Sequence, residues 1–346
     1  MADVREKLNM SDNIGIYSKL GKIETLIYKQ PWGVRSIGIW GMPGIGKTTL
    51  AKAAFDQLSG DYEASCFIKD FNKAFHEKGL YGLLEAHFGK ILREELGIKS
   101  SITRPILLRN VLRHKRVLVV LDDVCKPLDA ESFLGGFDWF CPGSLIIITS
   151  RDKQVFSICR VDQIYEVPGL NEEEALQLFS RCAFGKEIIH ESLQKLSKKV
   201  IDYANGNPLA LIFFGCMSRK NPKPIEIAFP KVKKYLAHEI HDAVKSTYDS
   251  LSSNEKNIFL DIACLFRGEN VDCVIHLLEG CGFFPRVEIN VLVEKCLVSM
   301  AEGRVVMHNL IQSIGRKIIN GGKRRSRLWK PLIIKYFLED RQVLVC

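Results

Sequence analysis

The sequence predicts an α/β domain with a doubly wound parallel sheet, followed by a helical domain and a winged-helix domain. Apolar runs that alternate with helical patterns predict the first domain. Runs that are apolar at every position are typical of parallel strands covered on both faces, and polar residues follow each run. These runs lie at residues 37–40, 117–121, 145–149 and 164–167. After residue 168 the pattern becomes helical and ends in three short helices and a hairpin, which predicts the other two domains.

The composition is typical of a folded chain. Its 346 residues are 47% hydrophobic and 26% charged, which suffices for two or three packed domains. The apolar runs fall short of the ~20 residues that cross a bilayer, and the charged start lacks a secretory signal. We therefore expect a cytoplasmic chain without a membrane span. The eleven cysteines form no C-x-x-C pair, which favours small buried side chains over disulfides or a zinc site.

Positive charge is concentrated at the C-terminal end. The formal net charge is +9, and residues 316–346 hold nine Lys or Arg against two Asp or Glu, a net of +7. The nearly neutral remainder argues against a broad nucleic-acid-binding face. The basic cluster at 323–327 could bind phosphates or act as a nuclear localisation signal, which makes the nucleus the alternative location. We favour a solvated basic linker for this cluster.

Helices in the first half are predicted from apolar residues spaced three or four apart. An entry helix is predicted within residues 12–30, and a second helix follows a glycine-rich loop and ends near Gly60. Residues 61–115 are interpreted as mostly helical, with an apolar stripe that Gly97 ends. The side chains that mark one face of the entry helix are Ile16, Leu20, Ile23 and Ile27.

Capping residues place the helices of the second half. Asn171 is the predicted N-cap of a helix whose first turn carries three glutamates. A turn at 205–208 opens the next helix, and Ser252 with Glu255 has the spacing of a capping box. The other predicted elements are a connector at 219–231, short helices near 271–279 and 286–295, and a hairpin turn at 301–303.

The segment from Gly41 to Thr48 matches G-x-x-x-x-G-K-[ST] in full and lies between a strand and a helix. Its glycines let the backbone fold around phosphate oxygens, while the N–H groups and the helix N-terminus supply partial positive charge. Lys47 would reach the β- and γ-phosphates, and the Thr48 hydroxyl would ligate Mg²⁺. The residues predicted to hold the phosphates are Gly41, Met42, Pro43, Gly44, Ile45, Gly46, Lys47, Thr48 and Thr49.

Two aspartates and an arginine follow the next long strands. Asp122 ends a buried strand and is predicted to hold Mg²⁺ through water, and Asp123 could polarise a water molecule near the γ-phosphate as the candidate catalytic carboxylate. Arg151 follows the neighbouring strand and would sense the γ-phosphate. The alternatives are two solvated carboxylates at a strand end and a plain surface arginine.

Six segments, in order, resemble the NB-ARC proteins of plants, the nucleotide-binding core of intracellular disease-resistance receptors. They are 38–51 with the glycine loop, 117–124 with its Leu-Asp-Asp-Val ending, 143–152 with Ser-Arg-Asp, 206–211 with Gly-Asn-Pro-Leu-Ala-Leu, 259–264 and 325–329. The last two segments resemble the receptors that carry a TIR domain rather than a coiled coil. Residues 133–140 resemble the subset that also carries a WRKY DNA-binding domain.

The resemblance implies a P-loop NTPase domain of the STAND type and further nucleotide contacts. Ile14 and Gly15 would line the adenine pocket, Pro208 would pack near the base, and His308 would contact the β-phosphate of ADP. The implied domains are a linker and entry helix at 1–30, a P-loop nucleotide-binding domain at 31–168, a helical domain at 169–232, a winged-helix domain at 233–322 and a basic linker at 323–346.

This sequence departs from the family pattern in two respects. The family's Met-His-Asp reads Met307-His308-Asn309 here, so a carboxylate that would help to hold the closed state is missing. A TIR domain and leucine-rich repeats are not found within these residues, so NADase activity and ligand sensing are not expected of this polypeptide.

The function predicted is a conformational switch of an immune receptor that binds ADP or ATP with Mg²⁺ and acts in defence signalling. Any ATPase activity would be slow, and other receptor protomers are expected as partners. Two alternatives stay open. One is a P-loop ATPase of ordinary turnover, and the other is nucleic-acid binding through the winged helix and the basic cluster, which we do not expect of this chain.

Overall fold

The structure is a computed structural model that describes residues 14–29, 33–96, 110–184, 194–220, 240–280 and 282–321. The chain divides into two compact units. Unit 1 contains residues Met1–Asp202 and Gly206–Pro222, and unit 2 contains Tyr203–Asn205 and Lys223–Cys346. The predicted basic linker lies outside the described residues, as does most of the predicted connector. To cross a membrane, a helix would have to be longer and more apolar than those formed by the described residues.

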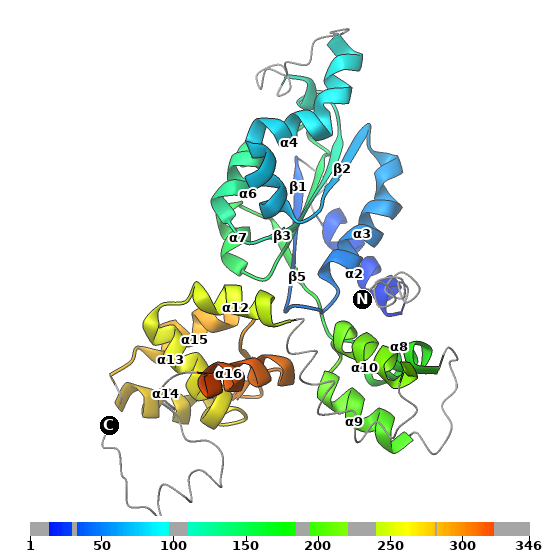
Figure 1. The fold of residues 1–346 in the computed structure, drawn as a ribbon. Helices are drawn as coiled ribbons and strands as arrows, with labels where there is room; N and C mark the ends of the chain where they lie inside the picture. The colour runs from blue at the N-terminus through cyan, green and yellow to red at the C-terminus, as the bar shows by residue number, and fades with distance from the viewer. Residues whose placement is uncertain are drawn as a thin grey trace, which may run out of the picture. The chain divides into compact units, whose positions relative to one another are not determined.

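The centre of unit 1 is a five-stranded parallel sheet (Figure 1). Its strands are β1 (Arg35–Trp40), β2 (Ala64–Ile68), β3 (Val117–Val124), β4 (Leu145–Ser150) and β5 (Gln163–Glu166), in the order β2-β3-β4-β1-β5. All six residues of β4 are buried, because helices cover both faces. In this order β4 lies between β1, which precedes the glycine loop, and β3, which contains the aspartate pair.

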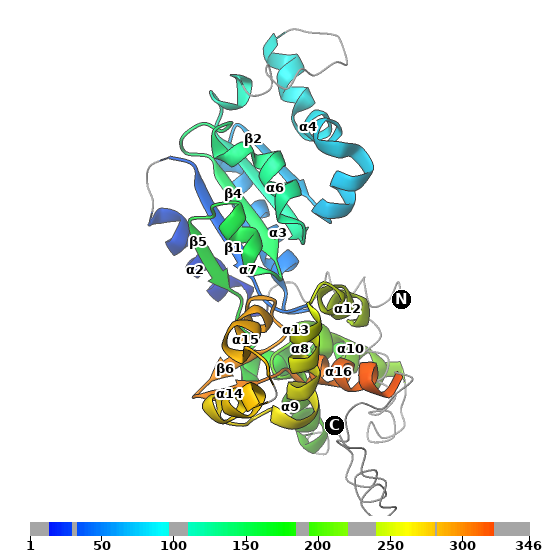
Figure 2. The ribbon, with the colours of Figure 1, turned by 90° about the vertical axis from the view of Figure 1, so that its left-hand side faces the viewer.

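Helices cover the two faces of this sheet (Figure 1). On one face lie α2 (Ile16–Tyr28) and α3 (Lys47–Leu58), and the four predicted apolar residues of α2 are buried in a core shared with β1 and β5. The other face carries α4 (Phe71–Leu96), α6 (Pro127–Leu134) and α7 (Lys153–Ile158). Figure 2 looks onto this second face, with α6 and α7 in front of the strands.

The interpretation of residues 61–115 as mostly helical is wrong at β2. This strand runs from Ala64 to Ile68 and pairs with β3 alone, so it is an edge strand. Its buried residues alternate with more exposed ones, whereas the other long strands are continuous apolar runs. Five residues with alternating burial give too short a pattern to separate from the helices on either side.

Three helices follow the sheet: α8 (Glu172–Phe184), α9 (Gln194–Ala204) and α10 (Pro208–Lys220). They belong to unit 1, except that the last two residues of α9 belong to unit 2. The predicted cap of α8 is confirmed, because Asn171 Oδ1 accepts from Glu174 N at 2.8 Å and Asn171 N donates to Glu174 Oε2 at 3.0 Å. Helices α8 and α10 pack closely at Gly215, where an added Cβ would lie 2.5 Å from Cys182 Cβ.

Unit 2 is helical with one short hairpin. Its elements are α12 (His241–Asp249), α13 (Ser253–Asp261), a π-helical turn (Ile262–Phe266), α14 (Val271–Gly280), α15 (Pro285–Glu294), β6 (Ser299–Ala301), β7 (Arg304–Val306) and α16 (Asn309–Gly321). The predicted capping box of Ser252 and Glu255 is present. The hairpin turn is Glu302-Gly303, one residue shorter than predicted, and both residues have positive φ as a type I′ turn requires.

Cysteine burial follows the expectation only in part. Cys66, Cys159, Cys182 and Cys216 are buried, as small apolar side chains would be, whereas Cys125 and Cys273 are exposed. Burial raises the pKa of both the Cys66 and the Cys159 thiol to about 12, so these two stay protonated at neutral pH.

Candidate functional site

Strand β1 and helix α3 form the ends of the phosphate-binding loop, residues 41–48. Gly44 and Gly46 have left-handed backbones, with φ of 77° and 100°, and Gly46 is the N-cap of α3. A side chain at Gly46 would meet open space, so the conformation rather than crowding requires glycine there. The first turn of α3 has N–H groups without acceptors within the helix, and they point toward the loop.

Lys47 is folded onto this loop. Its Nζ donates to the carbonyl oxygens of Gly41 at 2.8 Å and Met42 at 3.0 Å, and the residue is 8% exposed. These carbonyls hold the ammonium group at the place where the motif predicts a phosphate. A phosphate group would replace two neutral acceptors with charged ones, which bind an ammonium more strongly.

Thr48 and Asp122 meet as predicted. The Thr48 hydroxyl lies 2.9 Å from Asp122 Oδ1 and 3.2 Å from Oδ2. Thr149, at the end of β4, donates its hydroxyl to Asp122 Oδ1 at 2.8 Å and accepts from Asp123 N at 2.8 Å. Sequence reasoning missed Thr149, since only the position of β4 between β1 and β3 shows that this side chain lies between the two motifs.

Burial raises the pKa of the Asp122 carboxyl, which is 1% exposed. The hydrogen bonds from Thr149 and Thr48 oppose this rise, and the nearby carboxylates of Asp123 and Asp70 add to it. A carboxylate and a hydroxyl at hydrogen-bonding distance are the oxygen ligands that Mg²⁺ prefers. These residues therefore fit the predicted cation.

Asp123 and Arg151 form an ion pair at the same edge of the sheet. Arg151 Nη2 lies 3.4 Å from Asp123 Oδ1, and the arginine side chain is only 15% exposed. Trp40, at the end of β1, donates its indole N–H to Arg151 O at 3.3 Å. Lys153 Nζ lies 3.9 Å from the centre of the Trp40 ring, a cation–π contact. The structure thus places Arg151 beside Asp123 and the end of β1, and its role as a sensor of the γ-phosphate stays a prediction.

The turn before α10 contacts the loop from another side. Pro208 is the first residue of α10, and Asn207, before it, donates its side-chain amide to Pro43 O at 3.0 Å. Leu209 N donates to Gly44 O at 3.3 Å. The packing of Pro208 near the base, which the family resemblance implies, stays a prediction. Sequence reasoning missed Asn207, which is fully buried.

Gly15 and Ile14 lie where helix α2 begins. Gly15 has a φ of 70°, and a Cβ there would lie 2.8 Å from Leu170 Cδ2. Leu170 N in turn donates to Gly206 O at 2.8 Å, beside the turn that opens α10. The structure therefore brings Gly15 close to the Gly206 turn through Leu170. The adenine contact of Ile14 and Gly15 stays a prediction.

His308 and Asn309 belong to unit 2. His308 Nε2 lies 2.9 Å from Ala204 O, and His308 Nδ1 accepts from Leu310 N at 3.2 Å. Asn309 Nδ2 donates to Tyr203 O at 2.9 Å. Both side chains thus contact the short segment Tyr203–Asn205 that unit 2 includes. The phosphate contact expected of His308 stays a prediction.

Family models match two segments of this chain. Residues 18–188 match the NB-ARC domain, and residues 252–322 match the winged-helix domain of Roq1-like disease resistance proteins. The chain is 61% identical to the Arabidopsis thaliana disease resistance protein RRS1B and 59% identical to RRS1 of that plant, over 98% and 97% of its length. It belongs to the NB-ARC disease resistance proteins.

A more distant relative agrees with this family assignment, and a solved structure shares the fold. The TMV resistance protein N of Nicotiana glutinosa is 40% identical over 91% of the chain. The chain spans about a quarter of the length of these curated relatives: 25% of RRS1B and of RRS1, and 28% of protein N. A Walker-type ATPase of Pyrococcus abyssi shares the fold, with a TM-score of 0.62 at 12% identity over 86% of this chain and 95% of that one.

These matches confirm the fold class, a P-loop NTPase domain followed by a winged-helix domain, and the resemblance to plant NB-ARC proteins. The two RRS1 relatives also support the finer resemblance to the WRKY-carrying subset. The individual site residues stay predictions, because a family match does not test them one by one.

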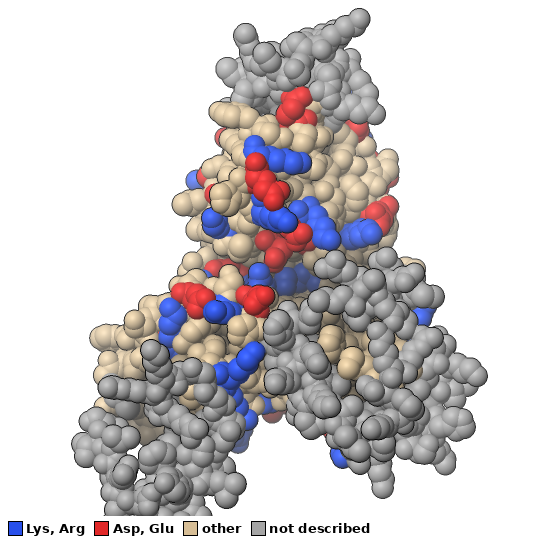
Figure 3. All heavy atoms as spheres, viewed as in Figure 1, with Lys and Arg blue, Asp and Glu red and all other residues tan. Residues whose placement is uncertain are grey.

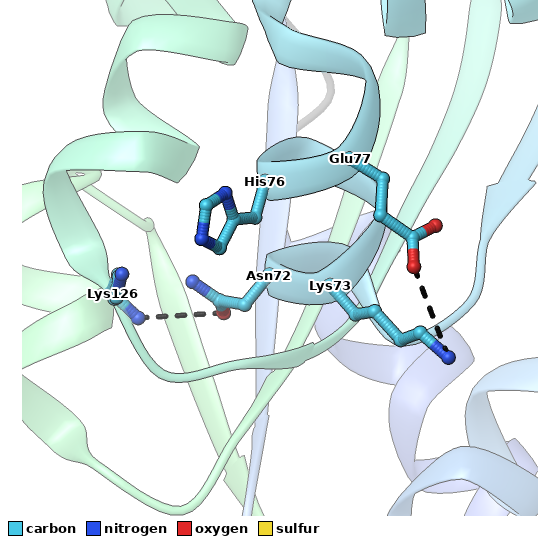
Figure 4. Close-up of a pocket in the computed structure, with 5 residues that line it drawn as sticks. All are labelled: Asn72, Lys73, His76, Glu77 and Lys126. Carbon is cyan, nitrogen blue, oxygen red and sulfur yellow. Dashed lines mark hydrogen bonds and ion pairs between the residues drawn. The ribbon is translucent and has the colours of Figure 1, made fainter.

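A separate hollow of about 560 Å³ lies between the start of α4 and the residue that precedes α6 (Figure 4). Its lining residues are Asn72, Lys73, His76, Glu77 and Lys126. Asn72 Oδ1 accepts from the backbone N–H groups of Cys125 and Lys126, which fixes the chain directly after β3. The hollow shares no residue with the predicted nucleotide site.

Proposed function

We propose that this NB-ARC region binds ADP or ATP with Mg²⁺ and changes conformation with the nucleotide bound, as the switch of a plant disease resistance protein. One observation carries the proposal. A strand-loop-helix with the full phosphate-binding motif has Lys47 across the loop, and its Thr48 hydroxyl lies 2.9 Å from the buried Asp122 carboxylate. Three neighbouring strands of one sheet supply these groups: the loop follows β1, Asp122 lies in β3, and Arg151 follows β4.

Each group has a distinct role in the proposal. The loop N–H groups and Lys47 would hold the phosphates, and Thr48 with Asp122 would hold Mg²⁺, which neutralises phosphate charge when bound. Pro208, Ile14 and Gly15 would enclose the adenine, as the family resemblance implies. His308 would contact the β-phosphate of ADP from the winged-helix domain.

The switch would depend on the γ-phosphate. Arg151 now pairs with Asp123 at 3.4 Å, a separation too long for a strong hydrogen bond, so a phosphate can compete for the guanidinium. To move an equilibrium from mostly closed to mostly open, ADP and ATP must differ by about 5 kcal/mol in their preference for the two states.

Hydrolysis, if Asp123 supports it, would reset this switch slowly. The Asp123 side chain is 44% exposed and bound to Arg151, so it must leave that pair to polarise a water molecule. A measurement of phosphate release over many turnovers separates the two candidates. Steady cycling would favour an ordinary ATPase, and a single slow turnover would favour the switch.

The alternative of nucleic-acid binding was assigned to the winged helix and the basic cluster at 323–327, and this cluster lies outside the described residues. On the face of unit 1 seen in Figure 3, Lys and Arg side chains are interspersed with Asp and Glu. Such mixing gives no extended positive field for a phosphate backbone to follow on that face. We also propose oligomers with other receptor protomers and a role in defence signalling.

Replacing Lys47 with alanine tests the proposal directly. Because a charge-assisted hydrogen bond contributes ~1.5–3 kcal/mol, Lys47→Ala should weaken ADP binding about 10- to 100-fold in a calorimetric titration. Lys52→Ala, at an exposed position of the same helix, is the matched control and should bind as the unaltered protein does. Equal ADP affinity in both variants would refute the assignment of this loop.

A further inference from the structure

We propose that Asn207 is a positioning residue that fixes the phosphate-binding loop to the start of helix α10, so that affinity for nucleotide phosphates depends on this contact. The inference rests on the proposed function and adds to it a residue that the sequence motifs do not assign. It is carried by the two hydrogen bonds of one buried side chain and by the packing of Gly44.

The Asn207 amide joins two backbone segments that lie 164 residues apart in the sequence. Its Nδ2 donates to Pro43 O at 3.0 Å, in the loop. Its Oδ1 accepts from Ala210 N at 3.1 Å and thereby caps α10. The residue is fully buried, so water cannot replace either partner, and losing one bond would leave a buried polar group unsatisfied.

Gly44 shows how closely the two segments approach. A Cβ at this position would lie 2.9 Å from Leu209 Cβ and 3.0 Å from Asn207 Oδ1. Gly44 O also accepts from Leu209 N at 3.3 Å. Glycine at position 44, which the motif itself leaves open, is therefore required for contact with α10 as well as for its backbone conformation. By contrast, a Cβ at Gly46 would meet no atom within 4 Å.

These contacts hold one half of the loop while Lys47 and the first turn of α3 form the other half. The loop N–H groups can converge on a phosphate only if Pro43 and Gly44 keep their place relative to α3, since preorganised donors avoid the cost of ordering on binding. Because the adenine lies at the other end of the nucleotide, Asn207 should affect phosphate affinity far more than base affinity.

The test compares Asn207→Ala with Asn171→Ala. Both asparagines cap a helix through Oδ1, at 3.1 Å to Ala210 N and 2.8 Å to Glu174 N, but only Asn207 also donates to the loop. ADP and AMP are titrated against the unaltered protein and each variant. We expect Asn207→Ala to lower the preference for ADP over AMP about tenfold. Asn171→Ala should keep that preference.

A second variant separates the loop bond from the helix cap. Asn207→Asp keeps the acceptor for Ala210 N and loses the donor to Pro43 O, so it should also lose the preference for ADP. Faster amide hydrogen exchange at residues 44–47 of ligand-free Asn207→Ala should accompany the loss. A general loss of stability would lower ADP and AMP affinity together and leave their ratio unchanged.

The outcomes are distinct. If the unaltered protein prefers ADP and Asn207→Ala keeps the full preference, the positioning role of Asn207 is refuted while the proposed function stands. If the unaltered protein binds neither nucleotide, the proposed function fails and this inference fails with it.

Discussion

Thr149 connects two neighbouring aspartates through a single hydroxyl group. Its Oγ1 donates to Asp122 Oδ1 and accepts from Asp123 N, both at 2.8 Å. Together with the Thr48 hydroxyl, it stabilises the ionised form of a carboxyl whose pKa burial would otherwise raise further. The proposed cation site thus depends on a residue outside both motifs.

Thr149→Val tests this dependence on the hydroxyl. Removing a donor to a buried carboxylate should reduce the free energy of unfolding by ~1–3 kcal/mol and raise the Asp122 pKa further. Mg²⁺ requires the ionised carboxylate. As the pH is lowered, the variant should therefore lose Mg²⁺-dependent nucleotide binding at a higher pH than the unaltered protein does. The measurement is nucleotide affinity with and without Mg²⁺ between pH 5 and 8. Thr25→Val, at an exposed position of α2, is the control and should leave the pH midpoint unchanged.

Sequence reasoning predicted residues whose proposed role depends on a local pattern. It missed residues whose contacts depend on which distant segments of the chain lie side by side. Lys47, Thr48 and Asp122 were predictable because the motif places them on one loop and at one strand end. Thr149 and Asn207 were not, since their partners are 27 and 164 residues away in the sequence. Threonine also occurs at many strand ends, and asparagine at many helix caps, that bind no ligand.

At the scale of elements, continuous apolar runs were the most reliable signal. They predicted β1, β3 and β4, which lie inside the sheet, and the edge strand β5. The edge strand β2 was missed because its alternating five residues lie between two helical patterns. The capping residues Asn171 and Ser252 placed the starts of α8 and α13 correctly, because capping depends on four consecutive residues.

His308 lies just before α16 and contacts Ala204, the last residue of α9. Burial lowers the pKa of His308 from 6.5, and nearby Arg267 lowers it further, while hydrogen bonds to the carbonyls of Ala204 and Asn205 oppose the shift. In the neutral ring, Nε2 donates to Ala204 O and Nδ1 accepts from Leu310 N. Protonation would place an N–H group against the Leu310 N–H.

The unfolded chain therefore binds more protons than the folded chain between the lowered pKa and about 6.5, so stability falls as the pH drops through that range. His308→Gln keeps a donor for Ala204 O and cannot titrate, so it should flatten this dependence in denaturation curves recorded from pH 5 to 7.5. His276→Gln, at an exposed position of α14, should keep the slope. An unchanged slope in the His308 variant would contradict the assignment.

At the scale of the whole molecule, the chain passes between the two units at residues 202–206 and again near residue 222. The Gly206 turn and Asn207 follow the first crossing directly, and they contact Leu170 and the phosphate-binding loop within unit 1. Tyr203 and Ala204, just before it, contact Asn309 and His308 within unit 2. Residues 203–207 therefore include contacts within each unit: Asn207 with the loop in unit 1, and Tyr203 and Ala204 with Asn309 and His308 in unit 2.

The most direct measurement of the central claim is the nucleotide that the purified protein retains. The protein is denatured, and the released small molecules are separated and quantified by chromatography. The account predicts one adenine nucleotide per chain, and its loss in Lys47→Ala. A protein that releases none, and that binds neither ADP nor ATP when each is added at saturating concentration with Mg²⁺, would contradict it.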